Sequence, residues 1–470
     1  TEIYTLSLHD ALPILALAWH LARERATAPA SLLLDGGDFM TGNPICDLAV
    51  DGVYGGGWQD IRDLIGYGAA TVGNHEFDRG RENLGGLERR AAFPFLAADI
   101  LDEQGRPLLP DEPLVLERGG LRVGVMGVSC KELFNVTADT RTAGLSLRDQ
   151  ETVARELIAK LDPVTDLLVL ISHSGFEADE ALARRLAGSG LDVIVGAHSH
   201  TRLSEPRLEG GILIVQAGAR LKQLGRLDLR VADDRVAGYD GGLVQLSVPP
   251  DDPAGLAPAG VSPELATLVE TYRQKVDAEF GRVIGTLRVD WKRDSGEESN
   301  IGNWICDALR ARAGADVAFL NSGSIRKDLP AGPIRLMDAR EILPFENTLV
   351  TFDLTGAQIR RICEQNARNA GGGEHGIAQV SGLSYGWRRV GDHVEVEDVR
   401  VGGQPVVANR VYRAAAADYV VMKAEQIFGL PPLPTRYAGV GVTDAVVEAI
   451  ERAGAIESRV EGRIRELTGK

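Results

Sequence analysis

Residues 69–76 read Ala-Ala-Thr-Val-Gly-Asn-His-Glu, a short apolar run that ends in a polar turn. The same pattern recurs where apolar runs lead into Gly37-Asp38, into Ser172-His173-Ser174-Gly175 and into Gly196-Ala197-His198-Ser199-His200. Short apolar runs that end in turn residues predict buried strands. Helical patterns over residues 152–161 and 177–186 separate several of these runs. The first half of the chain therefore predicts a layered α/β domain.

The polar turns after these strands are expected to converge, because ligands of α/β sheets bind beyond the carboxyl ends of the strands. With Glu76 set aside, the turns supply one carboxylate, one amide oxygen and four imidazoles: Asp38, Asn74, His75, His173, His198 and His200. Imidazole and oxygen ligands together suit Mn, Zn, Fe, Co or Ni. A carboxylate can bridge two metal ions, and such a pair clamps the attacking and leaving oxygens of a phosphate displacement. The turns thus indicate a metal site for phosphate chemistry.

Composition and charge limit the classes of function. The chain has 470 residues, of which 44% are apolar, so two or three domains are expected. A net charge of -16 repels nucleic-acid backbones and argues against a polynucleotide partner. We find no apolar run long enough to span a membrane. The four cysteines show no C-x-x-C spacing; we expect scattered buried thiols, although two disulfides are the alternative in an exported protein.

A change in composition at residues 249–263, rich in Pro, Gly, Asp and Ala, predicts a linker. A helix over residues 263–280 is expected to follow it, and a second α/β unit to begin near residue 282. In that unit we expect a strand and a helix across residues 349–365 and a helical stretch over residues 443–467.

The order of DGGDFMTG (residues 35–42), GNHEFDRG (73–80), LISHSG (170–175) and GAHSH (196–200) resembles the 5′-nucleotidase branch of the calcineurin-like metallophosphoesterases. The resemblance implies an N-terminal four-layer α/β/β/α sandwich with a dinuclear site, and a C-terminal α/β substrate-binding domain. It implies that Asp38 bridges two divalent ions (Mn, Zn, Co or Fe). Asn74, His173 and His198 then bind one ion, and His200 binds the other. His75 matches the histidine that assists the leaving oxygen, and Asp78 matches the acid that orients it.

The second half carries further motifs of that family. Residues 321–326 (NSGSIR) resemble its N-x-G-x-I-R motif, in which Asn321 and Arg326 would bind the substrate. Residues 298–303 (ESNIGN) resemble a further motif of the family, with Ser299 as a plausible helix cap. Residues 343–349 (LPFENTL), 354–356 (LTG) and 379–382 (QVSG) also fit this domain and look mainly structural. The resemblance implies two aromatic rings around a base. This chain has Ile377 at one of those positions, and Phe428 is the expected survivor at the other.

The start of the chain differs from the family pattern. Residues 1–14 resemble a translated adapter, so we expect a non-native segment and a truncated N-terminus, without a visible signal peptide. The expected first strand and its D-x-H-G motif are then missing. We expect a metallophosphoesterase domain at residues 15–248, a linker with a bridging helix at 249–281, and a substrate domain at 282–470. The resemblance favours a bacterial protein exported to the periplasm or secreted.

The sequence therefore predicts a phosphate-ester hydrolase, most simply a 5′-nucleotidase whose partner is a small nucleotide. Relatives that act as cyclic phosphodiesterases have Asn where this chain has Asp78, which leans towards the nucleotidase. Three alternatives stay open: a 2′,3′-cyclic-nucleotide phosphodiesterase or UDP-sugar hydrolase, a broad phosphatase, and an inactive nucleotide- or metal-binding protein.

Overall fold

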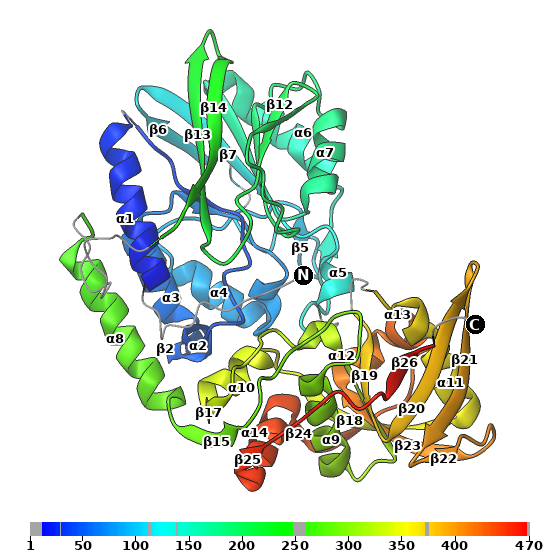
Figure 1. Cartoon of the computed structure of the whole chain (residues 1–470). Coiled ribbons are helices and arrows are strands. Elements are labelled where there is room, and N and C mark those ends of the chain that lie inside the picture. The colour runs from blue at the N-terminus through cyan, green and yellow to red at the C-terminus, as the bar shows by residue number, and fades with distance from the viewer. Residues whose placement is uncertain are drawn as a thin grey trace. The chain divides into compact units, whose positions relative to one another are not determined.

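The computed structural model describes residues 12–467, except residues 29, 111, 113, 138–139, 248–259 and 372–375. The chain divides into two compact units, with the division between Asp277 and Ala278 (Figure 1). Residues 1–11 of the segment expected to be non-native, and most of the expected linker, lie outside the described residues. Among the described helices, none combines the length and the apolar character needed to cross a membrane.

Two layers of β-structure organise the N-terminal unit. The larger sheet has six strands in the order β11 (Arg207–Glu209), β12 (Ile212–Val215), β10 (Val193–Gly196), β9 (Leu167–Ser172), β7 (Leu121–Val128) and β6 (Leu114–Arg118). The other layer holds the parallel pair β1 (Leu34–Asp35) and β4 (Ala69–Ala70) and the antiparallel hairpin β13 (Gln223–Ala232) and β14 (Arg235–Gln245). Two small pairs, β2 (Ala49–Val50) with β3 (Val53–Tyr54) and β5 (Ile100–Leu101) with β8 (Ser146–Leu147), complete the strands.

The burial of β9 shows how the layers stack. All six of its residues are buried, as expected for a strand covered on both faces. Leu168 and Leu170 pack with helices α6 (Gln150–Leu161) and α7 (Phe176–Arg185), which lie together beside the sheet in Figure 1. The alternate residues Leu167, Val169 and Ile171 instead belong to the apolar cluster shared with β1 and β13. Helices α1 (Leu12–Thr27), α3 (Gly56–Ile65) and α4 (Gly80–Arg90) complete the expected α/β/β/α sandwich.

The C-terminal unit is built on three sheets and one large core. The central sheet has the order β19 (Ala378–Ser381), β16 (Val317–Asn321), β23 (Val411–Ala417), β18 (Thr348–Thr355) and β24 (Arg436–Gly441). The second has the order β22 (Gln404–Pro405), β21 (His393–Val401), β20 (Leu383–Val390) and β26 (Ile464–Glu466). The third has the order β17 (Gly332–Arg335), β15 (Val283–Leu287) and β25 (Ala455–Ile456).

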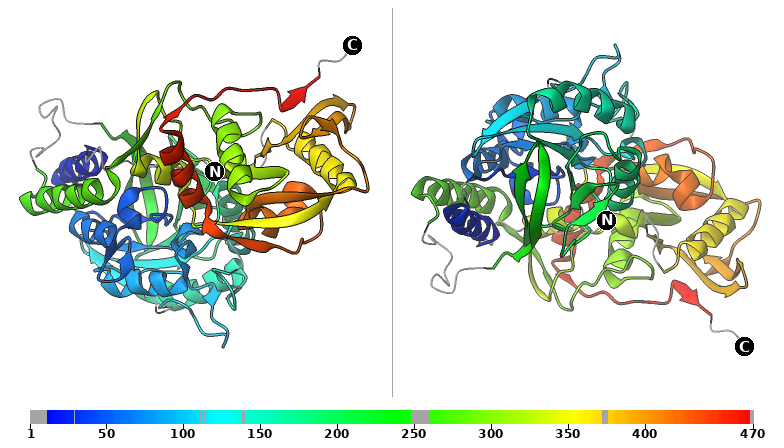
Figure 2. Two further views of the ribbon diagram at one scale, coloured as in Figure 1. Left: turned by 90° about the horizontal axis from the view of Figure 1, so that it is seen from below. Right: turned by 90° about the horizontal axis from the view of Figure 1, so that it is seen from above.

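The helices of this unit begin at polar caps. Ser299 caps α9 (Asn300–Ala313) by accepting the Gly302 amide at 3.1 Å, as expected from the sequence. Thr355 forms a capping box with Gln358 at the start of α11 (Gly356–Arg368). Figure 2 shows α11 beside the strands β20 and β21. The remaining helices in the second half of the chain are α8 (Pro263–Phe280), α10 (Leu336–Ile342), α12 (Asp418–Met422), α13 (Ala424–Phe428) and α14 (Val442–Ala453).

Two elements differ from the sequence-based expectation. The helical pattern at residues 443–467 ends at Ala453, because Gly454 has φ +67 and the chain then forms β25 and β26. The apolar run at residues 243–248 predicts a last strand for the N-terminal unit, but that strand, β14, begins earlier, at Arg235. Three of its first eight residues are glycine (Gly238, Gly241 and Gly242), which hides the alternation of apolar and polar residues. Helix α8 has the bounds expected for the bridging helix.

Candidate metal-dependent active site

Two pairs of parallel strands bring the polar turns of the N-terminal unit together. Strands β1 and β4 pair in parallel, and their carboxyl ends lead into the turns that carry Asp38 and Asn74. Strands β9 and β10 also pair in parallel, with Ser172 opposite Gly196, and they lead into His173 and His198. Each of the two β-layers of the sandwich thus contributes two neighbouring turns to the site.

Asp38, His173 and His198 form the centre of the site. One ligand atom from each of these side chains lies within 4.8 Å of the other two. Asp38 Oδ2 and His173 Nε2 are 3.0 Å apart as an ion pair. The other ring nitrogen of His173, Nδ1, lies 2.5 Å from the Gly36 carbonyl oxygen. This contact fixes Nδ1 as the donor and directs Nε2 to the centre, as outer-shell contacts of metal-binding histidines do.

Two further ligand atoms are buried with no polar contact to satisfy them. Asn74 Oδ1 and His198 Nδ1 accept no hydrogen bond from any residue in the described part of the chain. Buried polar atoms are nearly always satisfied in folded proteins, so atoms of this kind call for an explanation. A cation held by these atoms together with Asp38 and His173 explains them, and the donor set fits a divalent transition metal. His200 lies outside the cluster of three ligand atoms.

Gly73 permits the close approach of the turns. A Cβ atom at this residue would lie 2.2 Å from Asp38 Oδ1 and 2.5 Å from His173 Nε2. Any side chain there would therefore occupy the space in which the ligand atoms meet. The glycine of the GNHE motif is thus required by the site geometry.

Burial and neighbouring charges shift the pKa values of the acidic and imidazole side chains of the site in different directions. Burial alone would raise the pKa of Asp38, but the imidazoles of His173 and His75 outweigh it and hold the pKa well below its usual range. Burial lowers the pKa of His173, yet the adjacent Asp38 carboxylate more than compensates and raises it to about 9. Burial lowers the pKa of His198 and of His200 to about 4. These two imidazoles are therefore neutral at neutral pH, the form that binds metals.

His75 and Asp78 form the expected dyad beside this centre. His75 Nδ1 lies 2.8 Å from Asp78 Oδ2, and the His75 backbone amide donates to Asp38 Oδ1 at 2.9 Å. The same Asp78 oxygen accepts the Thr41 hydroxyl at 2.6 Å. The spacing of three residues across the short 3₁₀ helix η1 (His75–Phe77) brings the two side chains together. Thr41 was not identified from the sequence, because its contact crosses 37 residues.

Sequence reasoning also set aside Glu76 and overlooked Cys130. Glu76 is fully buried beneath the turns of Asp38 and Asn74. Cys130 Sγ lies 4.0 Å from His198 Nε2. All four cysteines are buried and unpaired, which confirms the expectation of scattered thiols. Burial raises the pKa of the Cys130 thiol above its usual range.

In the C-terminal unit, Asn321 and Arg326 lie on either side of the short helix η3 (Ser322–Ser324). Asn321 is buried and accepts the Ser324 hydroxyl. The Arg326 guanidinium lies over the half-buried ring of Phe345, 5.0 Å from its centroid. Phe345 was not identified from the sequence as a candidate binding residue. The available signal is its place in the Leu-Pro-Phe-Glu-Asn segment at residues 343–347, which looks mainly structural in the sequence.

Phe428 lies in the core and not at a surface. Its side chain is fully buried against Phe319 and Phe352, with ring centroids 5.1 and 6.2 Å away. It therefore presents no ring face to a base, which disagrees with the stacking role expected from the sequence. Ile377, at the other expected aromatic position, is also buried.

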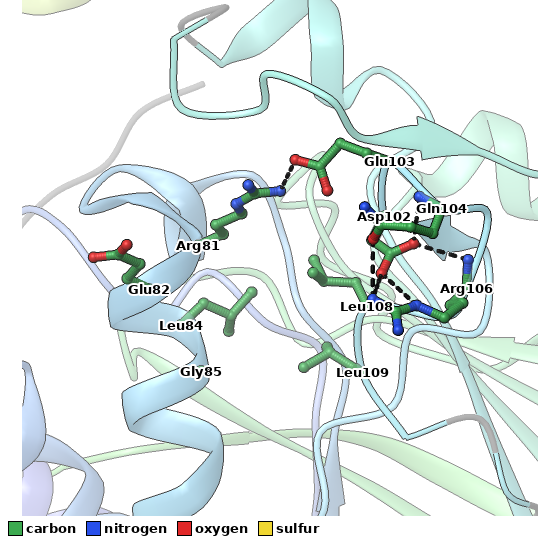
Figure 3. A pocket seen from close by; sticks show the side chains of 10 residues that line it. All are labelled: Arg81, Glu82, Leu84, Gly85, Asp102, Glu103, Gln104, Arg106, Leu108 and Leu109. Carbon is green, nitrogen blue, oxygen red and sulfur yellow. Dashed lines mark hydrogen bonds and ion pairs between the residues drawn. The ribbon is translucent and has the colours of Figure 1, made fainter.

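A separate cavity of about 310 Å³ lies between α4 and residues 102–109 (Figure 3). Four of its charged lining side chains pair with one another: Arg81 with Glu103, and Arg106 with Asp102. None of the predicted ligands or catalytic residues lines it. This cavity is therefore distinct from the candidate site.

Comparison with known proteins agrees with this geometry. Residues 8–202 match the calcineurin-like phosphoesterases, and residues 283–429 match the 5′-nucleotidase C-terminal domain. The chain is 26% identical over 466 residues to protein UshA of Yersinia enterocolitica, covering 90% of this chain and 82% of that protein. It is also similar to the structure of a 5′-nucleotidase precursor from Thermus thermophilus (27% identity, TM-score 0.77, 98% and 94% of the two chains). The sulfate thiohydrolase SoxB of Thermus thermophilus shares the fold (22% identity, TM-score 0.75, 98% and 83%).

The fold and the site thus define a metal-dependent phosphoesterase, an enzyme whose cofactors are divalent metal ions. More narrowly, the chain belongs to the family in which a calcineurin-like phosphoesterase domain precedes a 5′-nucleotidase C-terminal domain.

Proposed function

We propose that this hydrolase is a 5′-nucleotidase with a dinuclear metal centre that releases phosphate from nucleotides. The observation that carries the proposal is the convergence of Asp38, His173 and His198 beside the His75–Asp78 dyad, with the buried, unsatisfied Oδ1 of Asn74 in the adjoining turn. The names of the relatives support a nucleotide as substrate.

In this proposal Asp38, Asn74, His173 and His198 would hold one ion, and Asp38 and His200 would help to hold the second. Mn, Zn, Co or Fe suits these donors. When bound, such ions polarise a phosphoryl oxygen and lower the pKa of water. The pKa values of His198 and His200, lowered by burial to about 4, support neutral ligand imidazoles.

His75 handles the proton of the leaving oxygen. Its Nδ1 faces the Asp78 carboxylate at 2.8 Å, so Nε2 is the ring nitrogen that transfers a proton to the departing group. Asp78 stabilises the charged imidazole, and the Thr41 hydroxyl holds Asp78 in place.

Arg326 and Asn321 of the C-terminal unit bind the substrate. The guanidinium of Arg326 offers several donors in one plane, which suits the oxygens of a nucleotide. Its position over the Phe345 ring keeps an aromatic surface next to those donors. We also propose that the enzyme acts outside the cytoplasm, in the periplasm or after secretion, as the family resemblance implies.

The test is phosphate release by the purified chain in excess Mn²⁺. The substrates are AMP, a 2′,3′-cyclic nucleotide, UDP-glucose and p-nitrophenyl phosphate. His75→Ala runs beside His393→Ala, a matched control because His393 is exposed on strand β21. Release from AMP that requires metal and His75, but not His393, is the expected result. A folded chain that binds Mn²⁺ but hydrolyses none of these esters would refute the proposal and support an inactive binding protein.

A broad phosphatase is the second candidate, and the burial of Phe428 and Ile377 favours it. Without two stacking rings the site loses base contacts worth about 1–3 kcal/mol each. Comparison of kcat/KM for AMP and ribose 5-phosphate separates the two functions. A nucleotidase prefers AMP at least tenfold, whereas equal values identify a broad phosphatase.

A further inference from the structure

We infer that Glu76 is a positioning residue that builds the turn carrying Asp38 and joins it to the turn carrying Asn74. The inference rests on the proposed metal site and adds to it a residue that does not itself ligate a metal. It comes from the hydrogen bonds of a single buried carboxylate, whose exposed fraction is 0%.

Both oxygens of Glu76 accept backbone amides from two segments. Oε2 accepts the Asp38 amide at 2.8 Å and the Gly73 amide at 2.6 Å. Oε1 accepts the amides of Phe39 at 2.8 Å and Met40 at 3.1 Å. Three of the four donors are the consecutive residues 38–40, which lie more than 35 positions before Glu76 in the chain.

The turn at residues 38–40 needs an anion at this place. Asp38 adopts φ +60, a left-handed conformation that a residue with a side chain rarely occupies. Successive amides around such a residue point to one side and form a concave site for negative charge. The Glu76 carboxylate occupies that concavity and satisfies amides that would otherwise be buried without partners.

The consequence for the metal site is a fixed distance between ligands from different strands. Asp38 follows β1, and Asn74 follows β4. Glu76 bonds to the Asp38 amide and to the Gly73 amide beside Asn74. Asp38 Oδ1 in turn accepts the His75 amide at 2.9 Å, which makes the link reciprocal. Outer groups of this kind orient metal ligands, and their loss lowers metal affinity.

Glu298 offers a matched control for a purely structural role. It is a buried glutamate in the C-terminal unit, 8% exposed, that accepts the backbone amides of Glu461 at 2.7 Å and Ile464 at 3.1 Å. Replacing either glutamate by glutamine puts an NH₂ group against amide donors and destabilises the fold. Only Glu76 touches the turns that carry metal ligands.

The test compares E76Q, E298Q and the unchanged chain by calorimetric titration with Mn²⁺. We expect E76Q to bind Mn²⁺ about 10- to 100-fold more weakly, and E298Q to bind it as the unchanged chain does. Hydrogen–deuterium exchange without metal is the second readout. The amides of residues 38–40 and 73 should exchange about tenfold faster or more in E76Q, and at the original rate in E298Q.

Equal Mn²⁺ affinity in all three proteins would overturn the inference. If the unchanged chain binds no Mn²⁺, the proposed metal site fails, and exchange at residues 38–40 alone decides the role of Glu76 in the turn. Unaltered exchange in E76Q refutes that role. If E76Q does not fold, E76D replaces it, because aspartate keeps the charge but retracts it by one methylene. The same direction of change is expected, and unchanged affinity and exchange in E76D refute the inference.

Discussion

Binding of a divalent ion should stabilise the N-terminal unit by an amount that can be worked out from the site. Asn74 Oδ1 and His198 Nδ1 are buried and accept no hydrogen bond from the described residues. Each such atom costs about 1–3 kcal/mol, so a cation that both atoms ligate relieves about 2–6 kcal/mol. The coupling of metal binding to folding gives a similar stabilisation of the folded state, about 2.7 kcal/mol when Mn²⁺ is present at a hundred times its Kd. For a unit of this size the Tm should rise by about 5–11 °C.

Differential scanning calorimetry measures this shift on a chain freed of metal by a chelator and then titrated with MnCl₂. The variant His198→Ala removes one ligand and should lose most of the shift. His393→Ala, on an exposed strand of the other unit, should keep it. A Tm that is the same in chelator and in saturating Mn²⁺ would show that the side chains of Asp38, Asn74, His173 and His198 do not hold a metal. An equal shift in His198→Ala would place the ion elsewhere.

Three further outcomes follow from contacts in the two units. Asp78→Asn removes the charged partner of His75 at 2.8 Å, so kcat should fall about 10- to 100-fold with little change in KM; unchanged steady-state kinetics would contradict the dyad. Burial raises the pKa of Asp179 to about 7, against the opposing Ser172 hydroxyl. The native state then keeps a proton that the unfolded state releases from about pH 4, and stability should fall between about pH 4 and 7 by roughly 4 kcal/mol. Asp179→Asn should flatten this profile in urea unfolding, and an unaltered slope would exclude Asp179 as its source. Arg326→Ala should raise KM about tenfold or more with little effect on kcat, and a fall in kcat alone would count against a binding role.

The sequence predicts those features of the site that depend on short spacings along the chain and on the order of the strands. A strand end followed by a polar turn places Asp38 near Asn74 and His173 near His198, because parallel strands align their carboxyl ends. The His75–Asp78 contact follows from a spacing of three residues within one short helix. These features need only the order of strands and the known geometry of turns.

Contacts between distant segments could not be predicted in the same way. Glu76 looks like one more acidic residue in a turn, and its four amide partners appear only when the strands β1 and β4 are side by side. Phe428 illustrates the opposite error. Its motif position suggested a surface ring, but the small α13 helix turns it towards Phe319 and Phe352. The aromatic ring beside the Arg326 guanidinium is that of Phe345.

Four residues in the turns of the candidate site have left-handed backbone conformations. Asp38, Thr41, His198 and His200 all have positive φ, between 56 and 70. Residues with side chains pay about 1–3 kcal/mol each for such conformations, so the surrounding contacts must hold them. Glu76 holds Asp38 through its amide, and the Asp78 carboxylate holds the Thr41 hydroxyl. These contacts fix the turns that carry the candidate ligands, and fixing a binding site in its bound arrangement raises affinity by reducing the cost of ordering it.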